Sequence, residues 1–438
     1  MIDVVIIGAG ARGNRVFADL IATHDTGFSL CGVVEPDARR RAAFQHRYGI
    51  PAQRAFASVE DLVAVPRLGD MVFICTPDPT HFEVCRAVSA HGYDVLLEKP
   101  IATNLPDCLA LFDLQQACGN RIYVAHVMRY APFFRKVKEI VDSGRFGAVR
   151  HIQLAENVGH WHFAHSYVRG NWRRSDTSAP IILTKSSHDL DLLYWLVGRP
   201  VVSVVSHGSL SYFTEANAPE GSAGRCVDCE LRDRCIFSAT RFYLNDRDEW
   251  PFDIIAPGAR SLTARRRALE TGPYGRCVWR CDNDVCDIQT VVLEFDSGLL
   301  AMFGLYALTA DNTRKLTIQF DEAELFGDVR RNRLEISHFV GRKDELLVEE
   351  VALPGTADSH GGGDLALLQA LNEHLNGGEH LSLVTSLETS LPSHVLAFLA
   401  EESRRNGSRR IEVPPVLAGG RDWMRPPGRG DAAGAGGG

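Results

Sequence analysis

The chain has no hydrophobic run approaching the ~20 residues that a transmembrane helix needs. It also lacks an excess of positive charge, since 55 acidic side chains outnumber 47 Lys and Arg and give a formal net charge of -8. This balance gives the whole protein no electrostatic reason to bind nucleic acid or an anionic membrane. The first residues, Met1 to Ile7, carry no basic stretch of the kind that begins a signal peptide. We therefore expect a cytoplasmic protein whose partners are neither nucleic acids nor membranes.

The sequence contains no internal repeat, and it lacks the low hydrophobicity and high charge of a disordered chain. Hydrophobic residues make up 45% and charged residues 23% of its 438 residues. At about 150 residues per domain, this length predicts two large domains or three small ones. Only residues 416–438 are so rich in glycine, alanine and proline that we expect them to be disordered.

Residues 1–148 alternate short, β-branched apolar runs with amphipathic stretches of helix length. Such runs suit strands buried on both faces of a parallel sheet, and the stretches between them suit the helices that cover it. We predict a Rossmann-type α/β domain with a doubly wound parallel sheet. Strands are expected at 4–7, 30–34, 71–75, 95–97 and 122–125, with helices that include 12–22, 80–91 and 105–117.

From residue 149 the pattern changes to longer alternating segments, such as 151–155 and 289–295. Alternation of apolar and polar residues suits an open, mainly antiparallel sheet with one covered face. We therefore predict a second, α+β domain over residues 149–415. Its helices are expected at 188–196, 365–375 and 386–405, with Pro392 kinking or restarting the last one.

A glycine-rich motif, G-x-G-x-x-G, directly follows the first predicted strand. In dinucleotide-binding folds such glycines permit a tight turn, close approach of a pyrophosphate, and close packing of helix on strand. Glu35 ends the second predicted strand, where a carboxylate accepts hydrogen bonds from an adenosine ribose and repels a 2′-phosphate. The pattern favours NAD over NADP, although Arg39, Arg40 and Arg41 leave NADP open. The residues expected to bind the cofactor here are Gly8, Gly10, Ala11, Arg12, Gly13 and Glu35.

A second cofactor segment, Cys75-Thr76-Pro77-Asp78-Pro79-Thr80-His81, follows the strand at 71–75. The carboxyl ends of parallel strands meet at the ligand crevice of such sheets. We therefore expect Thr76, Pro77 and His81 to line the cofactor.

The strand at 95–97 runs into Glu98-Lys99-Pro100. A Rossmann start, this Glu-Lys-Pro motif and an open sheet after it resemble the Gfo/Idh/MocA family of NAD(P)-dependent sugar and cyclitol oxidoreductases. The resemblance covers roughly residues 1–415, excepting a cysteine-rich segment. It implies that Lys99 reaches the nicotinamide ring and the reacting hydroxyl, that Glu98 belongs to the same cofactor-side turn, and that the peptide bond before Pro100 is often cis. A partly desolvated lysine beside a cationic ring would have a lowered pKa, suited to proton transfer.

The segment 180–193 resembles the family's second signature, in which a helix carries a histidine into the active site. The resemblance implies that His188 is the acid–base partner of Lys99. The sequence departs from the commoner Asp-x-x-x-His form, because Thr184 stands at the aspartate's position and Lys185 follows it. Whether His188 has a carboxylate partner therefore stays open.

The stretch 156–174 packs hydrogen-bond donors and aromatic rings into one segment. Directional donors hold the hydroxyl groups of a polyhydroxylated substrate, and a donor-rich site discriminates strongly. The Lys, Arg and His side chains here also leave open an anionic group on the substrate. The expected substrate-binding residues are Lys99, His162, His165, Arg169, Asn171, Trp172, Lys185 and His188, whereas Glu156 is interpreted as structural.

Eleven cysteines are many for a reducing compartment, where stable disulfides are rare and clustered cysteines more often hold metal. One cysteine, Cys286, has no interpretation. Five lie in predicted strands and helices and are expected to be small core residues, namely Cys31, Cys75, Cys85, Cys108 and Cys118.

The remaining cysteines lie in residues 215–282, a segment rich in glycine and proline that we expect to be an insertion without a core of its own. It contains C-x2-C-x5-C and two later cysteines. Thiolates two residues apart reach one tetrahedral ion easily, and a fourth from a distant segment closes a structural zinc site. Reduced free cysteines are the alternative. The predicted zinc ligands are Cys226, Cys229, Cys235 and Cys277, with Cys281 as the alternative fourth.

Together these features predict an NAD-dependent oxidoreductase that acts on a hydroxyl group of a sugar, glycoside or cyclitol, with acid–base catalysis by Lys99 and His188. An alternative in the same fold is an NAD-dependent glycosidase or epimerase that oxidises, eliminates, hydrates and reduces. From another class, a non-catalytic NAD-binding sensor would keep the glycine motif but needs neither Lys99 nor His188. By analogy with the family, a homo-oligomer is expected.

Overall fold

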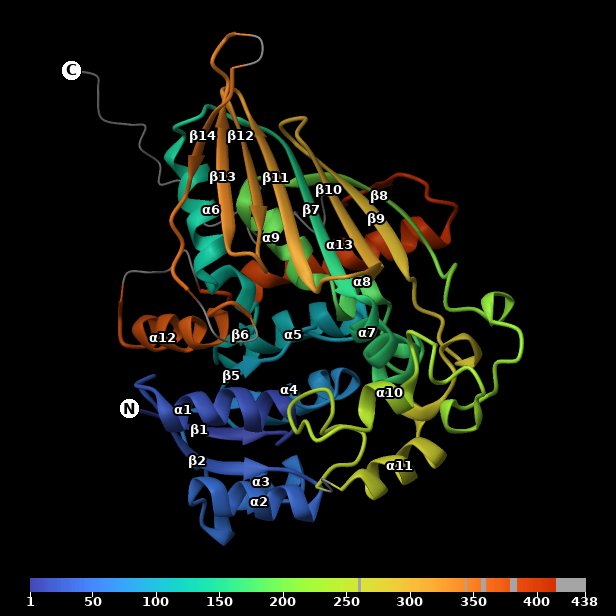
Figure 1. The fold of residues 1–438 in the computed structure, drawn as a ribbon. Helices are drawn as coiled ribbons and strands as arrows, with labels where there is room; N and C mark the ends of the chain where they lie inside the picture. The colour runs from blue at the N-terminus through green and yellow to red at the C-terminus, as the bar shows by residue number, and fades with distance from the viewer. Residues whose placement is uncertain (259–260, 343–344, 356–359, 379–383, 415–438) are drawn as a thin grey trace, which may run out of the picture.

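The protein contains two β-sheets with helices packed against them (Figure 1). The computed structural model describes residues 1–258, 261–342, 345–355, 360–378 and 384–414. The segment 416–438, expected to be disordered, lies outside these residues. None of the described helices is long and apolar enough to cross a membrane.

The first sheet is parallel, with the strand order β3-β2-β1-β4-β5-β6 of a Rossmann fold. All of β4 and most of β1 are buried, as expected for strands covered on both faces. The sequence missed β3, because two half-buried residues make no hydrophobic run. The strands are β1 Ile2–Ile7, β2 Phe28–Val34, β3 Ala55–Phe56, β4 Met71–Ile74, β5 Asp94–Leu97 and β6 Ile122–Val124.

Helix α5 of the first half begins and ends on capping residues readable in the sequence. The side chain of Asn104 accepts a hydrogen bond from Asp107 N–H at the start of α5, and Gly119, with φ 69°, ends it. The helices are α1 Asp19–Thr23, α2 Ala38–Tyr48, α3 Val59–Val63, α4 His81–Ala90, α5 Leu105–Cys118 and α6 Pro132–Ser143, with shorter helical segments η1 Ala11–Ala18, η2 Ala52–Arg54, η3 Asp78–Thr80 and η4 Val127–Tyr130.

The second sheet is mixed, with the order β14-β13-β12-β11-β7-β10-β9-β8-β15. Strands β7 and β10 pair in parallel and all other neighbours are antiparallel, which agrees with the mainly antiparallel sheet predicted. Helices α6, α9 and α13 cover one face (Figure 1). The strands are β7 Val149–Gly159, β8 Val201–Ser209, β9 Ile288–Phe295, β10 Leu300–Thr309, β11 Thr313–Phe320, β12 Ala323–Asp328, β13 Arg333–His338, β14 Leu347–Glu350 and β15 Ile411–Glu412.

Pro392 does not restart its helix, so this one of the two predicted effects was wrong, whereas a kink there stays a prediction. Helix α13 runs without interruption from Leu387 to Arg405. Proline has a helix-compatible φ and removes one hydrogen bond, and the burial of Leu391 and Val395 beside it offsets that loss. The other helices of this half are α7 His160–Phe163, α8 Ile181–Thr184, α9 Ser187–Val197 and α12 Gly363–Leu375, with short segments η5 Ala164–Arg169 and η6 Asn171–Arg173.

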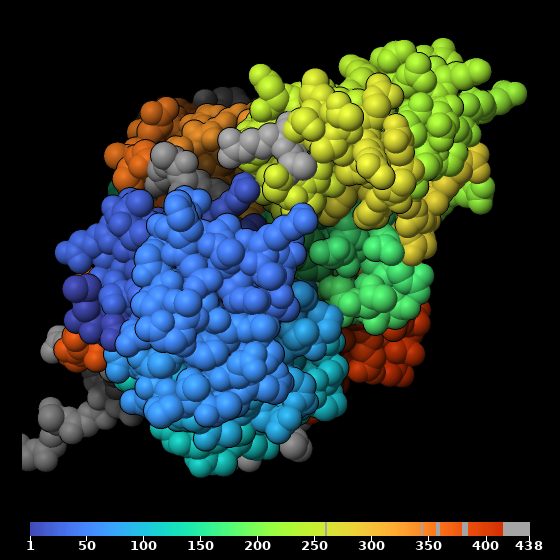
Figure 2. Space-filling view, turned by 90° about the horizontal axis from the view of Figure 1, so that it is seen from below, coloured from blue at the N-terminus to red at the C-terminus, as the bar shows by residue number. Residues whose placement is uncertain are grey.

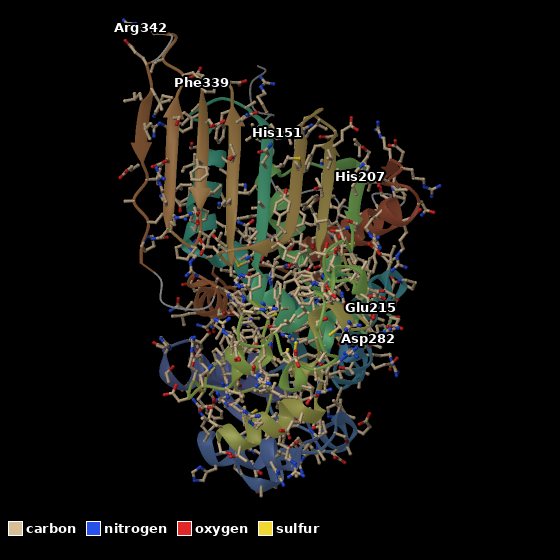
Figure 3. All side chains as sticks on the ribbon, turned by 45° about the vertical axis from the view of Figure 1, so that its right-hand side comes forward. His151, His207, Glu215, Asp282, Phe339 and Arg342 are labelled. Carbon is tan, nitrogen blue, oxygen red and sulfur yellow. The ribbon has the colours of Figure 1, made fainter. Side chains whose placement is uncertain are left out.

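A long segment, residues 210–287, joins the neighbouring strands β8 and β9, and is called the β8–β9 connection below. It reaches back to the first domain (Figure 2), where Arg15 pairs with Asp253 at 2.9 Å. Figure 3 shows Glu215 and Asp282 of this connection at one end of the second sheet, and Phe339 and Arg342 at the opposite end. Its helices are α10 Ala239–Tyr243 and α11 Leu262–Thr271, with short turns η7 Glu215–Asn217, η8 Cys226–Asp228, η9 Pro273–Gly275 and η10 Val278–Arg280.

The expectation that this segment lacks a core of its own was wrong. A small cluster of buried side chains forms within it, because aromatic residues dispersed along the sequence converge. Arg265, also buried, donates to the carbonyl of Asn245 at 2.5 Å. The cluster consists of Cys226, Ala239, Tyr243, Phe252, Ile255 and Leu269.

Candidate active site

The glycine motif forms the turn between β1 and the first helix, and its backbone fits a pyrophosphate. Gly8 has φ +94°, and a Cβ there would lie 2.7 Å from the carbonyl oxygen of Cys75. A Cβ on Gly13 would lie 2.0 Å from the Gly8 carbonyl oxygen, so side chains are excluded at both positions. At Gly10, by contrast, a Cβ would meet nothing within 4 Å. The open space above Gly10, at the helix N-terminus, suits the phosphates of NAD.

Glu35 is buried beside this turn. One carboxylate oxygen accepts a hydrogen bond from Ala9 N–H at 2.9 Å, and the other accepts from Asp37 N–H at 3.0 Å. Arg39 and Arg40 are exposed at the start of α2. The carboxylate is therefore held at the glycine turn, where the sequence placed it.

Arg12 of the glycine motif makes two contacts that the sequence did not predict, while its contact with the cofactor stays a prediction. Its Nε donates to Glu98 at 2.5 Å, and its Nη2 donates to Asp364 of α12 at 2.7 Å. The guanidinium keeps the pKa of Asp364 well below its usual value, against the effect of burial. Arg12 thus joins the glycine turn, the Glu-Lys-Pro turn and the second half of the chain.

His81 is fully buried, so direct contact with the cofactor is not what the structure places there. Its Nδ1 lies 2.7 Å from the carbonyl oxygen of Pro100, and its Nε2 lies 3.0 Å from that of Thr76. The Thr80 hydroxyl donates to the carbonyl of Pro77 at 2.8 Å. His81 and Thr80 therefore fix the two loops that border the cofactor crevice.

Lys99 follows β5 and precedes a cis peptide bond to Pro100. Its Nζ donates to the carbonyl oxygen of Thr184 at 2.7 Å, which brings the two sequence signatures together. Burial lowers the pKa of Lys99 to about 8, opposed by the charge of Asp78 and reinforced by that of Lys185. A lysine with such a pKa exchanges protons near neutral pH.

His188 lies in the first turn of α9 and is buried. Burial and the nearby charge of Lys99 hold its pKa well below the usual value, so its imidazole is neutral. Within the described part of the chain, its Nδ1 has no hydrogen-bond partner. The rings of His126 and His360 lie beside it, with centroids at 5.6 and 6.4 Å. The residue at the position of the family's aspartate is Thr184, which is buried.

Four charged side chains form a buried network next to His188. The Nζ of Lys185 lies 3.2 Å from Glu156, and Arg314 of β11 pairs with both Glu156 and Asp189. Burial raises the pKa of Asp189 to about 7, although Arg314 opposes this. Lys185 is therefore already paired with Glu156. This weakens the argument for an anionic substrate group.

The stretch 156–174, which was predicted to bind substrate, is called the substrate wall below. Three of its predicted residues are accessible to solvent. His162 is partly exposed, lies 3.2 Å from the Asn312 side chain, and has a pKa held well below its usual value by burial and by Lys185. Trp172 is 37% exposed and donates from Nε1 to Asp78 at 2.9 Å. Asn171 is exposed.

His165 and Arg169 instead point into the β8–β9 connection, which differs from the predicted contact with substrate. The Nδ1 of His165 lies 2.6 Å from the Tyr243 hydroxyl. Arg169 donates to the carbonyl oxygens of Arg276 and Phe237, each at 2.8 Å. Both side chains are buried and fasten the connection to the wall.

The structure places further residues at the site that were not predicted from the sequence. Arg314 and Asn312 come from the start of β11 and its preceding turn, where an alternating strand pattern carries no chemical signal. Trp161 and Trp250 add aromatic rings beside His162. Trp250 was missed because its segment was interpreted only through its cysteines.

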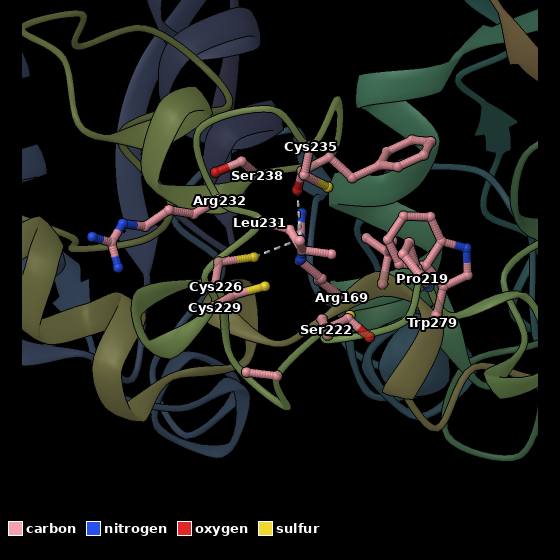
Figure 4. A pocket seen from close by; sticks show the side chains of 14 residues that line it. Arg169, Pro219, Ser222, Cys226, Cys229, Leu231, Arg232, Cys235, Ser238 and Trp279 are labelled. Atoms are coloured by element: carbon pink, nitrogen blue, oxygen red, sulfur yellow. Dashed lines mark hydrogen bonds between the residues drawn. The ribbon is translucent and has the colours of Figure 1, made fainter.

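The four predicted zinc ligands line one pocket together with Arg169 (Figure 4). The Arg169 Nη2 lies 3.6 Å from the Cys226 sulfur. In the described ranges, however, no three His, Cys, Asp or Glu side chains stand ready to hold a metal ion. The alternative ligand, Cys281, donates to the Cys277 carbonyl at 3.2 Å. Of the predicted core cysteines, Cys31, Cys85 and Cys108 are buried and Cys75 is half-buried, but Cys118 is exposed; Cys286 is buried.

Known proteins resemble this chain along most of its length. YteT of Bacillus subtilis strain 168, an oxidoreductase by description, is 24% identical over 390 residues, which are 85% of this chain and 88% of YteT. An inositol 2-dehydrogenase of Corynebacterium glutamicum is 29% identical over 205 residues, 46% of this chain and 56% of that enzyme. The chain therefore matches only about half the length of that dehydrogenase.

Solved structures share the fold. An oxidoreductase from Agrobacterium radiobacter in complex with NAD+, L-tartaric acid and magnesium has a TM-score of 0.66 and 17% identity, covering 94% of this chain and 98% of that one. The WlbA dehydrogenase from Bordetella pertussis in complex with NADH and UDP-GlcNAcA has a TM-score of 0.61 and 20% identity, covering 94% and 99%.

Family models match both halves of the chain. Residues 2–126 match the NAD-binding Rossmann fold of the Gfo/Idh/MocA oxidoreductase family, and residues 138–413 match that family's C-terminal α/β domain. With Glu35 bonded to the glycine turn and Arg12 joining that turn to the Glu-Lys-Pro turn, the chain belongs to the Gfo/Idh/MocA family of NAD-dependent oxidoreductases.

Proposed function

We propose that this enzyme oxidises a hydroxyl group of a sugar, glycoside or cyclitol, with Lys99 as the group that exchanges the substrate's proton. The main support is the environment of Lys99, whose pKa is about 8. Its Nζ donates a hydrogen bond to the carbonyl of Thr184, which lies four residues before His188 in the sequence. The relatives support this substrate class, since one is named an inositol 2-dehydrogenase and another structure holds UDP-GlcNAcA.

The chemistry asks two things of the chain. NAD, when bound, accepts a hydride from the carbon that carries the hydroxyl. Deprotonated Lys99 takes the hydroxyl proton as the carbonyl forms, and neutral His188 holds the same oxygen through its unpaired Nδ1. His81 and Arg12 position the loops, and Trp172, His162 and Asn171 contact the remaining hydroxyl groups and C–H faces.

The rival function in this fold is a glycosidase or epimerase that returns the hydride. Turnover of a panel of sugars, cyclitols and nitrophenyl glycosides with NAD separates the two. A dehydrogenase forms NADH in proportion to product, whereas the rival releases nitrophenol with catalytic NAD and no net NADH. A panel that gives neither signal, with NAD bound, would favour a sensor.

We further propose two domains, 1–148 and 149–415, and a homo-oligomer joined through the second sheet. Apolar side chains exposed on its strands, namely Ile288, Leu300, Leu308, Leu347 and Val348, support such an interface.

A structural zinc ion held by Cys226, Cys229, Cys235 and Cys277 also remains our proposal. The four thiols border one pocket, and the buried Arg169 beside them would offset the negative charge of a thiolate site.

Protein purified without an affinity tag or chelator is therefore expected to contain about one zinc per chain. Cys229→Ser should lower the zinc content severalfold and make the β8–β9 connection more sensitive to protease, since a ligand is lost. Cys118→Ser, at an exposed cysteine, is the matched control and should keep the metal. Metal-free protein with all eleven thiols titratable would refute the proposal.

A further inference from the structure

An exposed tryptophan of the β8–β9 connection lies against the substrate wall. The ring of Trp250 stands edge-on to that of His162, with centroids 5.0 Å apart and planes at 80°. The rings of His165 and Trp161 lie 5.5 and 5.8 Å away. Even so, 37% of Trp250 remains exposed. The wall contacts the Trp250 side chain and leaves part of it accessible.

Trp250 and Trp172 stand at the two ends of a belt of rings. Tyr167 lies 6.1 Å from Trp172 and 6.1 Å from His162, which Trp250 adjoins. Trp172 donates a hydrogen bond to Asp78, whose charge raises the pKa of Lys99. The Trp172 end of the belt therefore lies near the reacting groups. Among the described tryptophans only these two are exposed. One sugar ring covers about one indole face, which leaves Trp250 for a second ring.

The loop that carries Trp250 is held before any ligand binds. Phe252 is buried in the small core of the connection, and the buried Arg265 donates to carbonyl oxygens of the same loop. Asp253 pairs with Arg15 of the first domain at 2.9 Å. Because these contacts already fix the loop, little binding free energy is lost in ordering the loop when a ligand stacks on Trp250.

The charges near Trp250 disfavour an anionic group. Residues 245–253 carry four acidic side chains and one arginine, which disfavours a phosphate. His162, which adjoins the indole, is neutral because burial and Lys185 hold its pKa well below the usual value. An aromatic ring in these surroundings suits the C–H surface of a neutral sugar or the ring of an aryl group.

We propose that Trp250 forms an outer subsite that stacks on the second, uncharged ring of a glycoside, so that the enzyme prefers glycosides over single-ring sugars and cyclitols. This inference rests on the proposed function for the reacting ring. It makes the β8–β9 connection a specificity element.

The test compares two substrates that share the reacting sugar, its methyl glycoside and its nitrophenyl glycoside. In Trp250→Ala, the KM of the nitrophenyl glycoside should rise about five- to tenfold, because ring stacking is lost. Its kcat, and both constants for the methyl glycoside, should change less than twofold. Trp250→Phe, which keeps an aromatic face, should restore most of the difference.

A binding measurement keeps the test independent of turnover. The Kd of the nitrophenyl glycoside for NADH-loaded enzyme, by calorimetry, should rise in Trp250→Ala by the same factor. Ile236→Ala, at another exposed apolar residue of the connection, should change nothing. Equal changes for both glycosides, or none for either, would overturn the inference. If wild-type enzyme turns over neither, the proposed function fails, while an unchanged Kd in Trp250→Ala would separately remove the subsite.

Discussion

Replacing Lys99 by methionine is expected to lower kcat/KM by about 10²–10⁴-fold, the range for loss of a positioned acid–base group. Methionine keeps the length and apolar stem of lysine but cannot exchange a proton or donate to the Thr184 carbonyl. Steady-state kinetics with NAD and the best substrate of the panel gives the value. The Kd of NAD should change little, since Glu35 and the glycine turn are untouched.

The pH profile of the wild type sharpens this expectation. Burial lowers the pKa of Lys99 to about 8, so the deprotonated form gains population as pH rises through 8. The kcat/KM for oxidation should therefore increase about tenfold per pH unit below 8 and level off above it. Lys99→Arg keeps the positive charge, but arginine stays protonated over this pH range. The rise of kcat/KM below pH 8 should therefore be absent in this variant. A profile that keeps this rise in Lys99→Arg would assign the proton to another group.

The second large effect concerns stability. Arg129→Met is expected to lower the free energy of unfolding by about 3–5 kcal/mol, because it leaves a buried carboxylate without its partner. Arg129 is 2% exposed and donates to Asp191 of α9 at 2.6 and 2.5 Å, joining the end of the first domain to the second. Urea unfolding followed by circular dichroism gives the difference.

Arg121→Met is the matched control, because Arg121 pairs with Asp94 at the surface. That variant should lose at most about 1 kcal/mol. Burial already raises the pKa of Asp191, and loss of Arg129 raises it further. A carboxyl with a raised folded-state pKa destabilises more as pH rises through that value. The loss of unfolding free energy in Arg129→Met should thus be larger at pH 8 than at pH 5. Similar losses of unfolding free energy in Arg129→Met and Arg121→Met would contradict the stabilising role of the buried pair.

Local patterns predicted the parts of the fold that depend on near neighbours. The glycine motif, Glu35 and the strand before Lys99 all act within one βαβ unit, so a linear sequence reveals them. The Lys99 contact with Thr184 joins residues 85 positions apart, and only the resemblance to a family linked their two motifs.

Other residues could not be placed because their roles depend on distant partners. Arg12 was assigned to the cofactor by its motif, yet its carboxylate partner Asp364 lies 352 positions away. Arg169 and His165 looked like substrate donors in a donor-rich stretch, but Tyr243 and the backbone of the β8–β9 connection take up their hydrogen bonds. Donor density along a chain does not tell which way a side chain faces.

Two ion pairs join the first helical segment to the second half of the chain. Arg12 and Arg15 follow directly on the glycine turn, and their carboxylate partners, Asp364 and Asp253, both come from the second half of the chain. The placement of the nucleotide-binding turn is therefore set partly by residues far along the sequence from the Rossmann domain.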